Sequence, residues 1–152
     1  MSDLLHFEDF TPGQEFDLGA LVVTREEVVE FASEFDPQPF HLDEDAGKAS
    51  LLGGLAASGW HSAALVMRLL ATGLLTRATC MGSPGIRKLQ WKHPVFPGDT
   101  LTAKAEVLNR KDLRSKPDLG IVTMRVTALN QSATEVLTWE NAILFSRRET
   151  VA

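Results

Sequence analysis

The sequence lacks the features that are typical of secreted and membrane proteins. It has a single cysteine, Cys80, so no disulfide can form within the chain. Its longest apolar stretch, residues 63–75, is interrupted by Arg68, Thr72 and Gly73 and is shorter than the roughly 20 residues that span a bilayer. The first ten residues carry acids and lack the basic-then-apolar pattern of a signal peptide. We therefore expect a cytoplasmic protein with no membrane partner.

Sequence motifs of several common chemistries are also missing. There is no His-Glu-x-x-His pattern and there are no paired cysteines, so no metal site is expected. Neither a Gly-x-Ser-x-Gly turn nor a Walker-type phosphate loop occurs. The formal net charge of −5 is unlike that of a chain built to neutralise a nucleic-acid backbone. We expect no nucleic-acid partner.

The 152 residues suit a single domain, because no repeat, low-complexity tract or linker divides them. Residues 14–23 have the pattern of a β-strand. Thr24, with Glu27 three residues later, predicts the start of a short helix. A second helix, from about Ser58 to Leu75, has apolar residues over most of its circumference, which predicts a buried helix.

The rest of the chain has the period-two character of β-strands. Four segments show it: residues 85–95, 100–111, 120–131 and 135–148. Their short connections predict an antiparallel sheet. One strand, then helices, then four strands is an α+β order, and a sheet curved around the buried helix would cover that helix's apolar surface.

The first motif with chemical potential is the segment FDPQPFHLD, which places Asp36 and His41 five positions apart in a proline-stiffened turn. A carboxylate and an imidazole that share one water can supply the base and the acid for hydration of an enoyl thioester. The structural alternative is that Asp36 caps a turn and His41 is a partly buried residue without chemical work. The spacing alone leaves both interpretations open.

The second motif is GGLAASGWHS, residues 53–62, which leads into the predicted buried helix. A helix N-terminus offers free N–H groups and a partial positive charge. Gly59 would let a substrate approach the backbone, and its N–H can donate to a thioester oxygen that becomes an enolate. The alternative is that these small residues only pack the helix against the sheet.

Together with the segment PVFPGD, residues 94–99, these motifs resemble the MaoC-like (R)-specific enoyl-CoA hydratases. That family carries a D-x-N-P-x-H-x-D turn, an A-H-G turn about 18 residues after the histidine, and a P-V-x-x-G-D turn between two strands. Here His41 and Gly59 are 18 residues apart. The resemblance implies a hot-dog fold, an antiparallel sheet wrapped around a long central helix, over residues 1–152.

The resemblance also implies the roles of individual residues. Asp36 and His41 would be the catalytic pair and Gly59 the oxyanion donor. The substrate would be a trans-2-enoyl-CoA, with no cofactor, and the protein would be a homodimer or a higher homo-oligomer, with its site near the subunit boundary. Basic residues can hold coenzyme A phosphates, although ordinary solvated surface is the alternative. We predict substrate contacts from Ser58, Trp60, His61, Arg87 and Lys88.

Departures from the family pattern leave room for other functions. Gln38 stands in place of the family's asparagine, after an additional proline, and Ser58 replaces the histidine before the helix glycine. A serine that supports the aspartate in some members would fall near Met67, which cannot donate a hydrogen bond. The alternatives are a hot-dog acyl-CoA thioesterase and a non-catalytic acyl-thioester-binding protein. The acid and histidine in one turn favour the hydratase.

Overall fold

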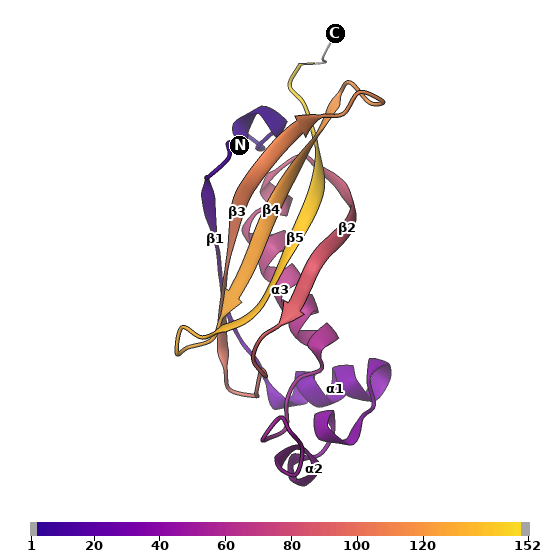
Figure 1. Ribbon diagram of the computed structural model, residues 1–152, viewed down its shortest axis with the longest axis vertical. Coiled ribbons are helices and arrows are strands. Elements are labelled where there is room, and N and C mark those ends of the chain that lie inside the picture. Colours follow the sequence, from indigo (N-terminus) through magenta and orange to yellow (C-terminus); the bar gives the residue numbers. More distant parts are fainter. Residues whose placement is uncertain (1–2, 150–152) are drawn as a thin grey trace.

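The computed structural model describes residues 3–149, and its centre is a five-stranded antiparallel sheet curved along one long helix, α3 (Figure 1). The strand order is β1-β3-β4-β5-β2. None of the helices within the described residues is both long and apolar enough to cross a membrane. In chain order the elements are η1 (Phe7–Asp9), β1 (Glu15–Val22), α1 (Arg25–Phe35), η2 (Pro39–His41), α2 (Glu44–Lys48), α3 (Gly59–Gly73), η3 (Leu75–Arg77), β2 (Cys80–Trp91), β3 (Thr100–Asp112), β4 (Leu119–Leu129) and β5 (Glu135–Ser146).

The core lies between the sheet and α3. Along β4 the alternating residues Val122, Met124, Val126 and Ala128 are fully buried, as the period-two pattern predicts. Trp139 on β5 is also buried, and its indole N–H donates to Asn141 Oδ1 at 3.0 Å. A buried indole with a satisfied N–H adds apolar contact without an unpaired donor.

The helical segments beneath the sheet begin at side-chain caps. Thr24 Oγ1 accepts a hydrogen bond from the Glu27 N–H at 3.2 Å and starts α1. Asp43 Oδ2 accepts from the Ala46 N–H at 2.9 Å and starts α2. The turn that contains Asp36 and the short η2 helix is therefore held between two capped helices.

Helix α3 differs from the sequence prediction in two respects. It ends at Gly73, two residues early, where a Cβ would lie 2.7 Å from the Leu18 carbonyl oxygen of β1. It is also not buried all round, because Ala64, Arg68 and Thr72 lie exposed on one face. Residues four apart share a helix face, and small or charged side chains on that face leave little apolar surface to cover.

Strand β2 also differs: it spans residues 80–91, whereas the pattern predicted 85–95. A register shift between Arg87 and Gln90, with Lys88 at a φ of 55°, interrupts the alternation that the prediction relied on. The strand ends at Trp91, and His93, expected within it, follows it in an exposed loop. Proline after His93 has no N–H to continue the ladder.

Candidate active site

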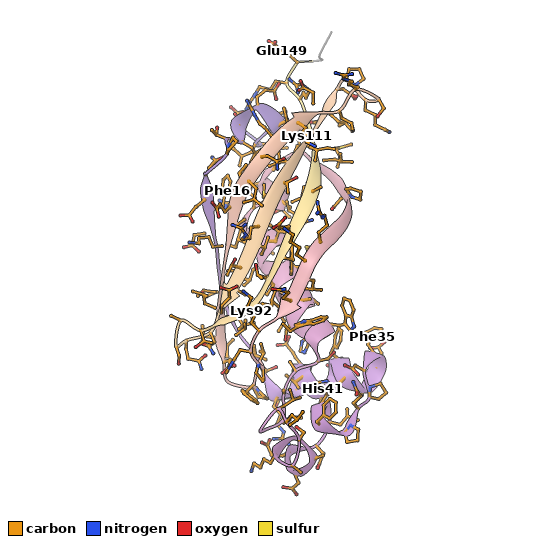
Figure 2. All side chains as sticks on the ribbon, viewed as in Figure 1. Phe16, Phe35, His41, Lys92, Lys111 and Glu149 are labelled. Atoms are coloured by element: carbon orange, nitrogen blue, oxygen red, sulfur yellow. The ribbon has the colours of Figure 1, made fainter. Side chains whose placement is uncertain are left out.

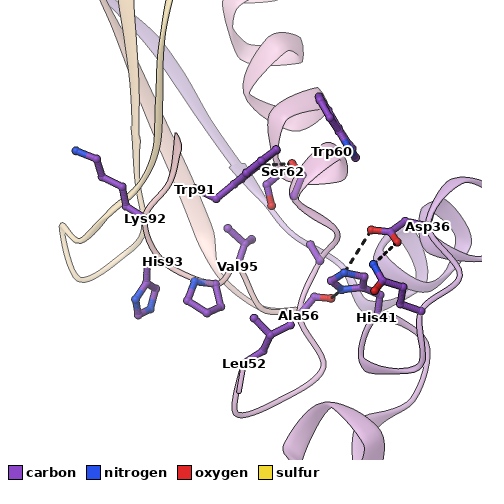
Figure 3. A pocket seen from close by; sticks show the side chains of 14 residues that line it. Asp36, His41, Leu52, Ala56, Trp60, Ser62, Trp91, Lys92, His93 and Val95 are labelled. Atoms are coloured by element: carbon purple, nitrogen blue, oxygen red, sulfur yellow. Dashed lines mark hydrogen bonds and ion pairs between the residues drawn. The ribbon is translucent and has the colours of Figure 1, made fainter. Parts of the chain in front are cut away.

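Asp36 and His41 are brought together by the turn after α1. The Asp36 N–H ends the helix by donating to the Ala32 carbonyl at 2.9 Å, and the Gln38 N–H donates to the Asp36 carbonyl at 2.7 Å. Pro39, whose ring fixes φ, then starts η2, and His41 is the last residue of that helix. As a result, His41 Nε2 lies 3.4 Å from Asp36 Oδ2 (Figure 3).

Two donors hold the Asp36 carboxylate. The Ser58 hydroxyl donates to Oδ2 at 2.7 Å, and the Gln38 amide donates to Oδ1 at 2.6 Å. Hydrogen bonds to the ionised form lower the pKa of Asp36, with Ser58 contributing most and Gln38 next. Ser58 is fully buried at the N-cap position of α3, yet its side chain caps nothing there. Its hydroxyl proton is committed to Asp36.

The His41 ring has one defined tautomer when it is neutral. Nδ1 lies 2.7 Å from the Ala56 carbonyl oxygen, which can only accept, so Nδ1 carries the proton. The lone pair is then on Nε2, on the side of Asp36. The ring is buried, and Phe40 packs edge-on against it with centroids 4.6 Å apart. This environment fixes both the tautomer and the orientation of the imidazole.

The start of α3 forms an adjoining wall. Gly59 is the first helical residue, and no hydrogen bond found within residues 3–149 uses its N–H. The Trp91 indole N–H donates to the Gly59 carbonyl at 2.7 Å. A Cβ at Gly59 would lie 2.6 Å from the Trp91 ring, so a glycine is required for the indole to rest there. Trp91 and Trp60 meet edge-to-face, with centroids 5.4 Å apart.

These groups line one pocket of about 430 Å³. Its accessible lining is mostly apolar, and the exposed rings of Trp60 and Trp91 form part of its wall. A mostly apolar hollow with a few convergent polar groups is the usual form of a small-molecule site. Within the described residues, no set of three or more His, Cys, Asp or Glu side chains is arranged to hold a metal ion. The apolar walls come from Leu52, Ala56, Ala57, Pro94 and Val95.

The structure brings together most of the residues predicted from the sequence. Asp36, His41, Gly59 and Trp60 line the pocket, and Ser58 contacts it through Asp36. His61 does not: it faces a separate hollow between α1 and α3. There its ring stacks on a phenylalanine at 4.8 Å, its Nδ1 is buried with no hydrogen-bond partner among residues 3–149, and burial lowers its pKa.

The predicted basic contacts also lie elsewhere. Arg87 and Lys88 do not line the pocket, and Lys88 Nζ instead pairs with Glu140 on the neighbouring strand at 3.3 Å. Lys111, another basic residue, on β3, lies at the end of the molecule opposite His41 (Figure 2). Lys92 does line the pocket, where its ammonium is 2.9 Å from Glu135.

Sequence reasoning missed Trp91 and Ser62 as pocket residues. Trp91 ends a strand whose predicted bounds were wrong, and no local pattern tells that a strand end will lie against a helix start. Ser62 was detectable, because it lies one helical turn after Ser58 and so shares its face. Its side chain is buried and lines the pocket.

The fold and the site together define a MaoC-like domain with the hot-dog fold. The family model described as "MaoC like domain" matches residues 8–130, so the chain belongs to this family. The MaoC-like dehydratase from Rhodospirillum rubrum is 44% identical, with a TM-score of 0.89 over 95% of this chain and 99% of that one. The (R)-hydratase from A. caviae involved in PHA biosynthesis is 26% identical, with a TM-score of 0.70 over 90% and 97%. The uncharacterized protein YdeM from Bacillus subtilis (strain 168) is 29% identical over 94% of this chain and 100% of its own.

Proposed function

We propose that the protein is a hydratase, or in the reverse direction a dehydratase, acting on a trans-2-enoyl thioester of coenzyme A. The observation that carries the proposal is the 3.4 Å approach of His41 Nε2 to Asp36 Oδ2 on the wall of an apolar pocket. A water that contacts both atoms would stand beside a space that fits an acyl group. Likeness to an (R)-hydratase supports the same reaction class.

The hydrogen bonds divide the work between the two side chains. Asp36 is a weak base, because two donors lower its pKa and occupy both of its oxygens. His41 has a free Nε2 lone pair and a proton fixed on Nδ1. His41 Nε2 therefore takes a proton from the water, while Asp36 orients the water and stabilises the imidazolium that forms.

The addition of water to the enoyl thioester then takes place in two steps. The water oxygen bonds to the β-carbon as its proton passes to His41, and the electron pair of the C=C bond moves onto the thioester oxygen. The enolate collapses, the α-carbon takes the proton from His41 Nε2, and the histidine is neutral again. The Gly59 N–H, at the start of α3, would donate to the enolate oxygen, where such a donor contributes about 3 kcal/mol in related oxyanion holes.

The test is a hydration assay on a panel of trans-2-enoyl-CoA substrates, following loss of the conjugated-enoyl absorbance. We expect hydration without release of free thiol, measured in parallel with a thiol reagent. Thiol release without hydration would identify a thioesterase instead. Binding of the thioesters without either reaction would identify an acyl-thioester-binding protein.

We further infer that the protein acts as a homodimer in the cytoplasm. Strand β2 is at one edge of the sheet and pairs only with β5 within the described chain. Large apolar side chains lie exposed along it, including Met81 and Ile86. An exposed, unpaired edge of this kind is a template for pairing with a second chain.

A further inference from the structure

The proposed function fixes the direction in which a bound thioester must run, and the following inference rests on it. In Figure 3 the pair of Asp36 and His41 lies on one side of the pocket, and Trp91, at the end of β2, lies on the other. The start of α3 contacts both sides, because the Ser58 hydroxyl donates to Asp36 at 2.7 Å and the Gly59 carbonyl accepts from the Trp91 indole at 2.7 Å. The carbonyl carbon of the thioester carries three groups, the oxygen, the acyl chain and the sulfur. In the proposed reaction the oxygen accepts from the Gly59 N–H and the acyl chain places its β-carbon at the Asp36–His41 pair. Only one direction is then left for the sulfur. Because the carbonyl carbon is planar, the acyl chain and the sulfur point away from each other. With the acyl chain directed toward Asp36 and His41, the sulfur points toward Trp91.

Trp91 is held rigidly in that position. Its N–H is used by the Gly59 carbonyl at 2.7 Å, and its ring rests on the Gly59 α-carbon. Trp60 meets the indole edge-to-face at an interplanar angle of 83°. The donor is therefore not available to a ligand, and what the ring offers is apolar aromatic surface, 46% of the residue being exposed.

We propose that Trp91 is a specificity-determining residue that binds the sulfur-bearing arm of the substrate, not its acyl chain. In a coenzyme A thioester, the arm begins next to the carbonyl with the sulfur, followed by methylene groups and an amide. None of these groups needs a charged partner. Sulfur–aromatic contacts contribute about 0.3–1.5 kcal/mol, and the methylene groups add apolar contact. A fixed ring loses little conformational entropy on binding.

The experiment varies the arm and the acyl group separately. The crotonyl thioesters of methanethiol, N-acetylcysteamine and coenzyme A differ only in the arm, so their kcat/KM values measure its contribution. Crotonyl- and hexenoyl-CoA differ only in the acyl chain and measure the contribution of that chain. In Trp91→Ala we expect the advantage in kcat/KM of the N-acetylcysteamine thioester over the methyl thioester to fall roughly fourfold to fifteenfold, the size of the apolar contact of one or two methylene groups, because the sulfur is present in both compounds and cancels in the ratio. The ratio between hexenoyl- and crotonyl-CoA should stay as in the wild type.

Controls separate the ring from the hydrogen bond and from the fold. Trp91→Phe keeps an aromatic surface without the N–H, so it should retain most of the arm preference. Leu51→Ala removes a fully exposed apolar side chain outside the pocket and should change neither ratio. Melting temperatures of all variants show whether Trp91→Ala is folded. If it is not, Trp91→Gln takes its place, because an amide can still donate to the Gly59 carbonyl but offers no apolar ring, and it should lose the arm preference in the same way. An arm ratio unchanged in the variant without the ring, or a changed acyl ratio, would overturn the assignment.

Binding of butyryl-CoA, which cannot be hydrated, separates this inference from the proposed reaction. A wild type that hydrates no enoyl thioester but binds butyryl-CoA, with Trp91→Ala weakening the Kd by a similar factor, refutes the reaction and supports the arm site. Hydration with an arm preference that does not depend on Trp91 refutes the arm site and leaves the reaction standing. Absence of both binding and hydration refutes both.

Discussion

At the scale of single residues, the departures from the family pattern compensate for one another. Met67 cannot supply the hydrogen bond that a serine gives the aspartate in some relatives. Ser58, which replaces a histidine, supplies a donor from the start of α3, and Gln38 supplies a second from within the turn. The carboxylate of Asp36 is thus fixed by two donors, although neither is the residue that the family pattern has at that position.

The proposed pair of Asp36 and His41 gives the first prediction. Asp36→Asn and His41→Ala should each lower kcat for hydration by roughly 10²–10⁴-fold, the usual contribution of a general acid–base group. Asp45→Asn, which makes the same chemical change on the exposed surface of α2, should leave kcat unchanged. Circular dichroism and thermal melting confirm that the variants are folded. Rates near wild type in both pair variants would remove these residues from the mechanism.

Ser58 gives a prediction about protonation. Its hydroxyl is the largest cause of the lowered pKa of Asp36, so Ser58→Ala should raise that pKa toward the ordinary value of about 3.9. The sign follows because the lost hydrogen bond favours the ionised form. Ser58→Thr, which keeps a hydroxyl, should restore most of the shift. The measurement is an NMR titration of the carboxyl carbon, and a pKa of Asp36 unchanged in Ser58→Ala would contradict the assignment.

At the scale of elements, the contact between the start of α3 and the end of β2 gives Gly59 two explanations. A side chain at this position would push the substrate away from the helix end, or it would displace the Trp91 ring, which a Cβ would approach to 2.6 Å. Removing the indole separates the two effects, because it leaves the helix end in place.

We therefore predict the outcome of a double-variant cycle. Gly59→Ala in the Trp91→Ala background should still lower kcat/KM about tenfold, since the methyl group obstructs the approach to the N–H whether or not the indole is present. Crotonyl-CoA should show the loss as clearly as longer substrates do. Kinetics and melting curves of the two single variants and the double variant test this. A double variant equal to Trp91→Ala would show that Gly59 serves only to accommodate the ring.

Elements with local signals were predictable from the sequence, and contacts between distant elements were not. Thr24 caps its helix as the sequence predicts, and β4 alternates as expected. The bounds of β2 were wrong, because a register shift near Lys88 breaks the alternation. The Asp36–His41 turn was found because both residues belong to one segment. The indole of Trp91 on Gly59 joins residues 32 positions apart and leaves no periodic trace.

At the scale of the whole molecule, the two edges of the sheet differ. Strand β1 forms one edge, and β2, with its exposed Ile86, forms the other. The pocket adjoins the end of β2, so a second chain paired along that strand would come near the opening of the pocket. This placement supports a site near a subunit boundary, as the family resemblance implies.

The two edges allow a matched test of assembly. Light scattering at micromolar concentration should give the mass of a dimer, twice the 16.7 kDa of the chain. Ile86→Lys places a charge on β2 and should shift the protein toward monomer, because charged side chains on an edge oppose pairing. Val22→Lys makes a similar change on the exposed end of β1 and should leave the dimer intact. A monomer-sized wild type, or equal effects of both variants, would refute pairing through β2.

The positions of the tryptophans give the protein a built-in optical label. The chain has three tryptophans and no tyrosine, so its near-ultraviolet emission comes from the indoles alone. Trp139 is buried in the core and emits from apolar surroundings, whereas Trp60 and Trp91 are partly exposed to solvent on the wall of the pocket. A ligand that enters the pocket would shift only the red part of the spectrum, and unfolding would move the blue part. One emission scan thus reports occupancy and folding separately, without an added dye.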